Sequence, residues 1–134
     1  MLITLIMGIF NFFASSDLSY KEFEKWVDSS LTAELPKDVV ALCFNLYDDD
    51  NGHWSVELVG TSSFDKDNSD WACNEVIDTR DNPLKWKSKK SWEKVLSSVR
   101  SHLETYLKNG KHASLLRSQQ GIGLGFVDGD LIIL

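Results

Sequence analysis

The chain has 134 residues, which fits a single domain, and its composition, 43% hydrophobic and 25% charged, is that of a globular protein rather than a disordered one. A chain of this size buries enough surface to fold without a disulfide or a metal ion. The formal net charge of −6 argues against a nucleic-acid binder, which presents excess Lys and Arg to phosphate, and is compatible with a basic protein partner.

Residues 1–13 are almost wholly apolar. No Lys or Arg precedes them, as a secretory signal would require, and the stretch is too short for a helix that spans a bilayer. We therefore expect a strand or short helix packed on the core of a cytoplasmic protein that is not attached to a membrane. Translation from Met7 and a cleaved signal are the alternatives.

The first helix is expected to begin near Ser19 and to end before Pro36. Ser19 and Glu22 have the spacing of a capping box, in which each side chain accepts a hydrogen bond from the other residue's backbone N–H. The apolar side of this helix should face the core. It carries Phe23, Trp26, Val27, Ser30 and Leu31.

Residues 39–47 predict a central strand, because nearly every side chain among them tolerates burial. The hairpin turn that follows contains Asn51 and Gly52, a favoured pair because both residues accept positive φ. The return strand, residues 53–60, should turn one face to the core and the other to water. The expected core residues are Trp54, Val56 and Leu58, and the expected water-facing residues are Ser55 and Glu57.

The middle of the chain is less regular. Residues 61–70 predict a polar, acidic loop, and residues 71–77 are apolar enough to pack back on the sheet without indicating a helix or a strand. Residues 78–86 predict an irregular connection.

A long amphipathic helix follows. Its apolar stripe consists of Trp92, Val95, Leu96, Val99, Leu103, Tyr106 and Leu107. Ser88 is the expected N-cap, and Asn109 with Gly110 is the expected end. Residues 112–119 predict a short helical continuation.

The chain ends in a second predicted hairpin with its turn at Asp128 and Gly129. In its first strand, residues 122–126, the apolar residues alternate with glycines. These glycines leave one strand face bare, which predicts either a closely packed helix or a bend. The order of helices and hairpins predicts a two-layer α+β domain, with an antiparallel sheet of at least four strands and two main helices packed on it.

No motif predicts catalysis, a metal site or a cofactor. The glycine-rich residues 121–125 precede a strand and not a helix, so they lack the context of a nucleotide-binding loop. The acidic run from Asp48 lacks the Gly and Glu that an EF-hand needs at its sixth and twelfth positions, although another kind of calcium site stays open. Cys43 and Cys73 form no CxxC pair, and we expect two buried thiols with a single disulfide as the alternative.

The charges divide unevenly along the chain. Residues 38–78 contain ten acids and one base, whereas residues 85–117 contain nine bases and two acids. Both regions can be solvated surfaces that attract each other within the fold. The functional alternative is that the first hairpin tip and the following loop form one negative face that captures a basic partner. The candidate partner-binding residues are Asp48, Asp49, Asp50, Glu57, Asp65, Asp67, Asp70 and Trp71, with Trp71 either an aromatic anchor or a core residue.

Two regions carry a resemblance to a known family. The first contains FNLY at residues 44–47, WSVELVGT at 54–61, FD at 64–65 and DWAC at 70–73, and the second is GIGLGFVDGD at 121–130. Together they resemble small bacterial immunity proteins, which are encoded beside polymorphic toxins. The resemblance covers roughly residues 37–134.

The resemblance implies a protein that binds a cognate toxin and occludes its active site. Many such toxins are nucleases with basic clefts, so an acidic face would mimic the nucleic acid. The residues themselves leave two other functions open. One is a small enzyme whose site assembles in space around His53 or His102 and nearby acids. The other is a structural or regulatory subunit that forms a homodimer through its apolar N-terminus and glycine-faced terminal strand.

Overall fold

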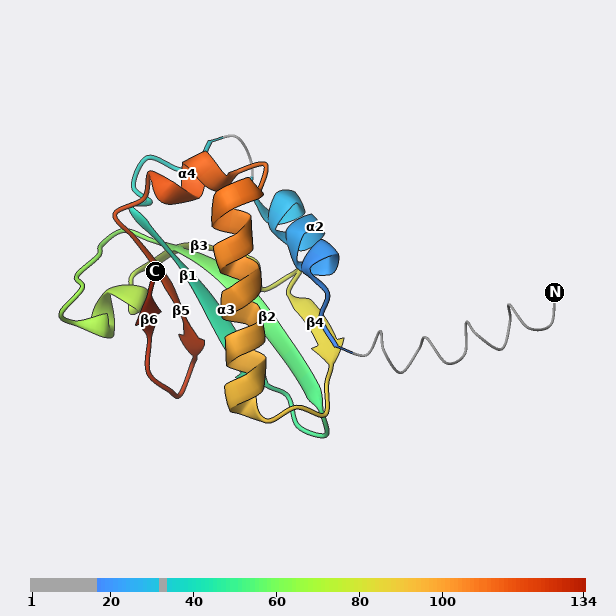
Figure 1. The fold of residues 1–134 in the computed structure, drawn as a ribbon. Coiled ribbons are helices and arrows are strands. Elements are labelled where there is room, and N and C mark those ends of the chain that lie inside the picture. The colour runs from blue at the N-terminus through green and yellow to red at the C-terminus, as the bar shows by residue number, and fades with distance from the viewer. Residues whose placement is uncertain (1–16, 32–33) are drawn as a thin grey trace, which may run out of the picture.

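A computed structural model describes residues 17–31 and 34–134, so the prediction for residues 1–13 lies outside the described residues. In chain order the elements are α2 (Tyr20–Ser30), β1 (Ala41–Asp48), β2 (His53–Thr61), the 3-10 helix η1 (Ser69–Cys73), β3 (Glu75–Asp78), β4 (Leu84–Lys87), α3 (Trp92–Asn109), α4 (Ala113–Arg117), β5 (Gly121–Phe126) and β6 (Ile132–Ile133). Helices α2 and α3 cover the same face of one sheet (Figure 1). The predicted α+β class is therefore confirmed.

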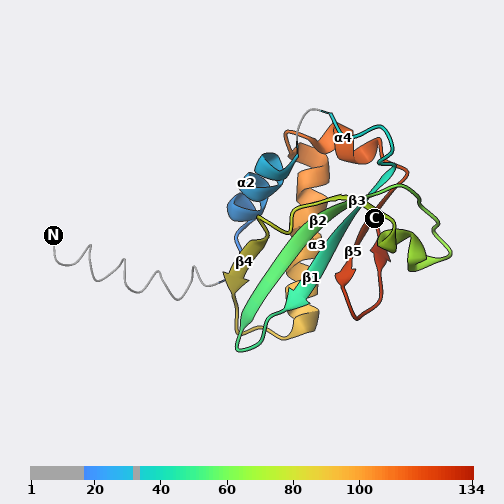
Figure 2. The ribbon, with the colours of Figure 1, turned by 180° about the vertical axis from the view of Figure 1, so that it is seen from behind.

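Within the described residues the sheet has six strands in the order β3-β2-β1-β5-β6, and β4 pairs with the start of β2 on the same edge as β3. Every pair is antiparallel except β1 and β5, which run parallel from the Ala41–Gly121 pair to the Leu46–Phe126 pair. The sequence predicted only antiparallel pairs. The parallel pair arises because α3 carries the chain back across the sheet before β5 begins (Figures 1 and 2).

The start of α2 is set by local hydrogen bonds, as predicted. The backbone N–H of Glu22 donates to Ser19 Oγ at 3.1 Å, and the backbone N–H of Ser19 donates to Glu22 Oε1 at 3.2 Å. This reciprocal pair is the predicted capping box. The helix ends at Ser30, before Pro36 as expected.

The long helix α3 begins one turn later than its predicted cap. Its N-cap is Ser91, whose Oγ accepts from the backbone N–H of Lys94, and not Ser88. Ser88 is buried and accepts instead from the backbone N–H of Lys90 in the preceding turn. The helix ends with Gly110 as its C-cap, as predicted.

The tip of the β1–β2 hairpin is a left-handed turn. Asp50, Asn51 and Gly52 have φ of 70°, 56° and 75°. Positive φ at Asn51 and Gly52 confirms the predicted turn residues, and the left-handed stretch extends one residue further, to Asp50. A Cβ at Gly52 would lie 3.1 Å from the carbonyl oxygen of Ser88, so this position needs glycine both for its φ and for its close approach to the backbone.

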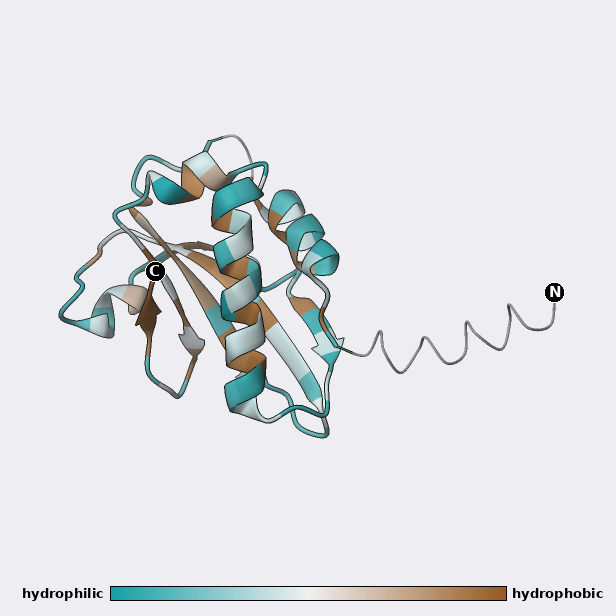
Figure 3. Ribbon diagram, in the orientation of Figure 1, coloured by the Kyte–Doolittle hydropathy of each residue, from teal (hydrophilic) through white to brown (hydrophobic). Residues whose placement is uncertain are grey.

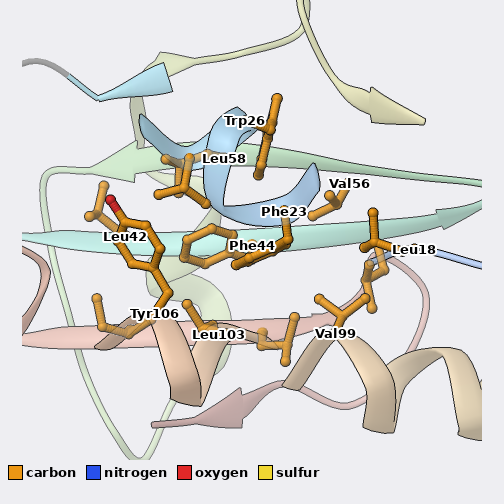
Figure 4. Close-up of a cluster of buried hydrophobic side chains, with 14 of the residues drawn as sticks. Leu18, Phe23, Trp26, Leu42, Phe44, Val56, Leu58, Val99, Leu103 and Tyr106 are labelled. Atoms are coloured by element: carbon orange, nitrogen blue, oxygen red, sulfur yellow. The ribbon is translucent and has the colours of Figure 1, made fainter. Parts of the chain in front are cut away.

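The main core lies between the two helices and the sheet. Helix α2 contributes Phe23 and Trp26, and α3 contributes Val99, Leu103 and Tyr106 (Figure 4). They pack on inward-facing residues of the central strands, which include Leu42, Phe44, Val56 and Leu58. Brown, hydrophobic segments run along β1 and part of β2, while the side of α3 turned to the viewer is mostly teal and white, in keeping with its amphipathic pattern (Figure 3).

Aromatic side chains cover the bare glycine face of β5. Phe64 lies over Gly121, and a Cβ at Gly123 would lie 3.1 Å from the ring of Trp71. The sequence predicted a closely packed helix or a bend at this face. The structure instead places two rings there, one from a loop and one from the short helix η1, because absent side chains leave room for flat aromatic groups.

Three other expectations need correction. Part of the stretch 78–86, predicted as irregular, lies in strand β4 (Leu84–Lys87), because these residues pair with the start of β2. Ser55 and Glu57, expected to face water, are buried, since neighbouring strands and Arg80 cover that face of β2. Cys43 is buried but Cys73 is exposed, and the two thiols are free, because η1 turns Cys73 away from the sheet.

Candidate functional site

The structure separates the two acidic groups that the sequence joined into one face. Asp48, Asp49 and Asp50 lie at the β1–β2 hairpin tip, where β2 begins. The loop with Asp65, Asp67 and Asp70 follows the other end of β2. At the usual rise per residue, the nine residues of β2 set these ends about 25 Å apart. The expected single acidic face is therefore replaced by two acidic sites at opposite ends of the sheet.

The six aspartates lie on the surface without a close ion pair to the bases of the described residues. All are exposed, and none forms an ion pair within the described part of the chain. Two of them organise their own loops: Asp48 Oδ1 accepts from the backbone N–H of Asp50, and Asp65 Oδ1 accepts from that of Asp67, each at 2.9 Å. Their negative charge therefore faces solvent at both ends of the sheet.

The other two candidate residues are not available to a partner. Trp71 is only 3% exposed, and its ring meets that of Phe64 edge to face at a centroid distance of 5.0 Å. Of the two roles that the sequence left open for Trp71, the structure supports the core role. Glu57 is 4% exposed, so its carboxylate cannot form part of an acidic outer face.

A cleft of about 500 Å³ beside the hairpin tip combines acids with an exposed aromatic ring; we call it the Trp92 cleft. It is lined by Asp48, Trp92, Leu96, Phe126, Asp128, Gly129, Asp130 and Ile132. Three of these residues are aspartates, and none is Lys or Arg. The backbone N–H of Val127 donates to the carbonyl of Leu46, which holds the turn after β5 beside the end of β1. The hairpin tip and the terminal turn thus form one acidic border.

Trp92 is 54% exposed, although the sequence placed it in the apolar stripe of α3. It is the first residue of that helix, and its ring meets Phe126 edge to face with centroids 6.1 Å apart. Val127, also 54% exposed, follows Phe126 directly. Sequence reasoning missed this surface because helical periodicity predicts that the whole apolar stripe of α3 is buried. It does not show that the sheet stops before the first residue of the helix. The sequence signal that could have indicated this surface was the predicted apolar strand 122–126, which leads into the turn at Asp128 and Gly129.

Glu57 lies in a polar cluster on the sheet face opposite the helices. Its Oε1 is 3.4 Å from Arg80 Nη2 and 3.4 Å from Asn45 Nδ2. Arg80 makes closer contacts with Glu75, at 2.6 Å, and with Asp78, at 3.1 Å. The hydrogen bond to Glu75, together with the charge of Glu57, raises the pKa of Arg80 above its ordinary value.

Cys43 and Tyr47 line the same face of β1. Burial raises the pKa of the Cys43 thiol to about 12, so the thiol is protonated at neutral pH. Burial and a hydrogen bond with Glu57 raise the pKa of Tyr47 to about 12, so the phenol is neutral. These groups are therefore unsuited to act as nucleophiles near pH 7.

In residues 17–31 and 34–134, no three His, Cys, Asp or Glu side chains gather in a way that could hold a metal ion. None of the described helices has the length and apolar character needed to cross a membrane. Comparisons with family models, with curated proteins and with solved structures find no match to this chain.

Proposed function

We propose that this protein acts by binding a basic protein partner through the Trp92 cleft and the adjoining hairpin tip. The observation that carries the proposal is a half-exposed tryptophan beside a cleft where, among the described residues, aspartates alone supply charge to the lining. Large aromatic side chains at the centre of an interface supply much of its binding energy. Surrounding charges mainly speed the encounter and select the partner.

The partner that the resemblance suggests is a bacterial toxin. The terminal turn with Asp128 and Asp130 belongs to one of the stretches that resemble immunity proteins, and this turn lines the cleft. An acidic border around an aromatic anchor suits a basic active-site cleft, such as that of a nuclease. The protein would neutralise the toxin by occupying that cleft and excluding its substrate.

Binding measurements with matched variants test this proposal. The partner to use is the purified toxin domain whose gene the resemblance implies lies beside this one, with affinity measured by calorimetry and association rate by surface plasmon resonance. Trp92→Ala should weaken the complex by about 30-fold, the loss typical of a hot-spot residue. Asp128→Lys should slow association, and added salt should slow association of the unmodified protein.

Asp67→Lys is the matched control for the charge reversal. It makes the same charge change at the other end of the sheet, outside the Trp92 cleft. Its association rate should stay close to that of the unmodified protein. Absence of a complex with the toxin domain, or equal effects of Asp128→Lys and Asp67→Lys, would contradict the proposal.

A second candidate function, small-molecule binding with or without catalysis, is favoured by one observation. A cavity on the sheet face opposite the helices is lined by His53, Asp49 and Glu57, residue types that serve as general acids and bases in enzymes. The third possibility from the sequence, self-association, is tested by sedimentation at increasing concentration, where the partner-binding proposal expects a monomer.

A further inference from the structure

A cavity of about 470 Å³ opens on the sheet face opposite α2 and α3, the face towards the viewer in Figure 2; we call it the Glu57 cavity. Three neighbouring strands build it. Tyr47 on β1 and Lys85 on β4 both lie directly opposite Ser55 on β2, and Glu57 lies two residues further along β2. Because alternate residues of a strand share a face, these side chains converge on the same space.

Ser55 presents a solvent-reached hydroxyl group to this cavity. The residue as a whole is 7% exposed and lines the cavity, and its hydroxyl makes no hydrogen bond within the described part of the chain. The hydroxyl is therefore free to bind a polar group that enters the cavity.

The Glu57 carboxylate accepts a hydrogen bond from Tyr47, and its other two contacts are long. Its contacts with Arg80 and Asn45 are both 3.4 Å, well beyond the usual N–H···O distance of about 2.9 Å. Arg80 lies closer to Glu75 and Asp78, so three carboxylates share one guanidinium. The cavity lining balances Asp49 and Glu57 against Arg80 and Lys85, and Glu75 and Asp78 beyond Arg80 give the surroundings two negative charges in excess, which favours a cation.

The remaining walls suit a planar cation. Tyr47 presents an aromatic ring, and guanidinium groups stack on aromatic faces and form paired hydrogen bonds with carboxylates. On the rim, Lys85 and Asp49 carry opposite charges beside the His53 ring. A rigid guanidinium could thus contact Glu57, the Ser55 hydroxyl and the Tyr47 ring together.

We propose that the Glu57 cavity binds a guanidinium group, supplied either by an arginine side chain of a protein or by a small molecule. The site is independent of the Trp92 cleft, because the two lie on opposite faces of the sheet.

Amide chemical shifts of the folded protein test the proposal. The probes are methylguanidinium chloride and an acetylated, amidated Gly-Arg-Gly peptide, with potassium chloride added at equal ionic strength as the blank and sodium acetate as the anion control. Both probes should shift the amides of Asn45, Tyr47, Ser55, Glu57 and Lys85, with a dissociation constant on the order of 1 mM for methylguanidinium. Acetate should leave these amides unchanged.

Two variants test the assigned contacts. Glu57→Gln removes the negative charge at constant size and should weaken binding by about tenfold. Because Glu57→Gln also disturbs Arg80 and Asn45, its fold is checked by thermal unfolding. Ser55→Ala removes a hydroxyl with no partner in the protein, so it should keep the fold and weaken binding by about threefold. Trp92→Ala should bind both probes like the unmodified protein, which separates this site from the proposed partner surface.

The relative affinity of the two probes identifies the source. Tighter binding of the peptide indicates an arginine side chain of a protein, and equal or weaker binding indicates a small molecule. Absence of localised shifts with both probes, shifts with acetate at the same amides, or unchanged affinity in both Ser55→Ala and folded Glu57→Gln would overturn the proposal.

Discussion

The same substitution at two tryptophans should have opposite consequences. Trp71 is buried on the open face of the sheet, where its ring covers Gly123 and packs against Phe64 and Cys43. Trp92 is half-exposed at the start of α3. We predict that Trp71→Ala destabilises the fold, whereas Trp92→Ala leaves stability nearly unchanged and weakens partner binding.

The size of the effect follows from what surrounds Trp71. Replacing a buried Trp by Ala costs about 3–5 kcal/mol, and the cost is larger where neighbours cannot fill the cavity. The Trp71 ring lies against Gly123, which has no side chain that could fill the space left by the ring. We therefore expect Trp71→Ala to lower the free energy of unfolding by about 4–5 kcal/mol. For a chain of this length the loss should lower the melting temperature by roughly 10–20 °C. Trp92→Ala should change the free energy of unfolding by less than about 1 kcal/mol.

Thermal and urea unfolding followed by circular dichroism measure both variants. Trp71→Phe provides a milder comparison, because it keeps an aromatic ring at this position and removes only part of the indole, whose N–H has no hydrogen-bond partner in the described residues. It should cost about 1–2 kcal/mol. Equal destabilisation by Trp71→Ala and Trp92→Ala would refute the assignment of Trp71 to the core.

Two further predictions concern a helix cap and the tyrosines. Ser19→Ala removes the side chain that accepts from the backbone N–H of Glu22 and should lower the free energy of unfolding by about 1 kcal/mol in urea denaturation, with no change expected in partner binding. Burial raises the pKa of Tyr20 and of Tyr47 to about 12, and it raises the pKa of Tyr106 as well. Unfolded tyrosines lose their proton near pH 10, so the contribution of these groups to stability is complete below about pH 10 and falls as the pH rises towards 12. Phenolate absorbance should therefore appear well above pH 10 in the folded protein but near pH 10 in urea, and a normal titration of the folded protein would contradict this.

Local patterns were sufficient for most elements of the fold. The capping box at Ser19, the turn at Asn51 and Gly52, and the amphipathic stripe of α3 each involve residues a few positions apart, so their geometry depends little on distant parts of the chain. The short strand β4 was missed for the opposite reason. It is a strand only because the start of β2 lies beside it.

For the candidate sites, too, local patterns were informative and contacts between distant segments could not be predicted. Alternation along β2 correctly separated Glu57 from the core-facing residues, but it could not show that Arg80 and a neighbouring strand cover that side. Likewise, sequence gives no sign that Trp71 would be buried and Trp92 exposed. Burial depends on which distant segments pack over a residue, and periodicity describes only one element at a time.

The sequence by itself determined the α+β class, the positions of the main helices and hairpins, and the presence of six exposed aspartates in two loops. Only the tertiary structure decided that β2 separates these two loops. It also decided that the terminal turn, with Asp128 and Asp130, lies beside the first hairpin, because α3 returns the chain so that β5 pairs with β1. The physical reason is that helix and turn signals arise from hydrogen bonds and side chains within a few residues. Surfaces arise from strand pairing across many residues, which no local pattern encodes.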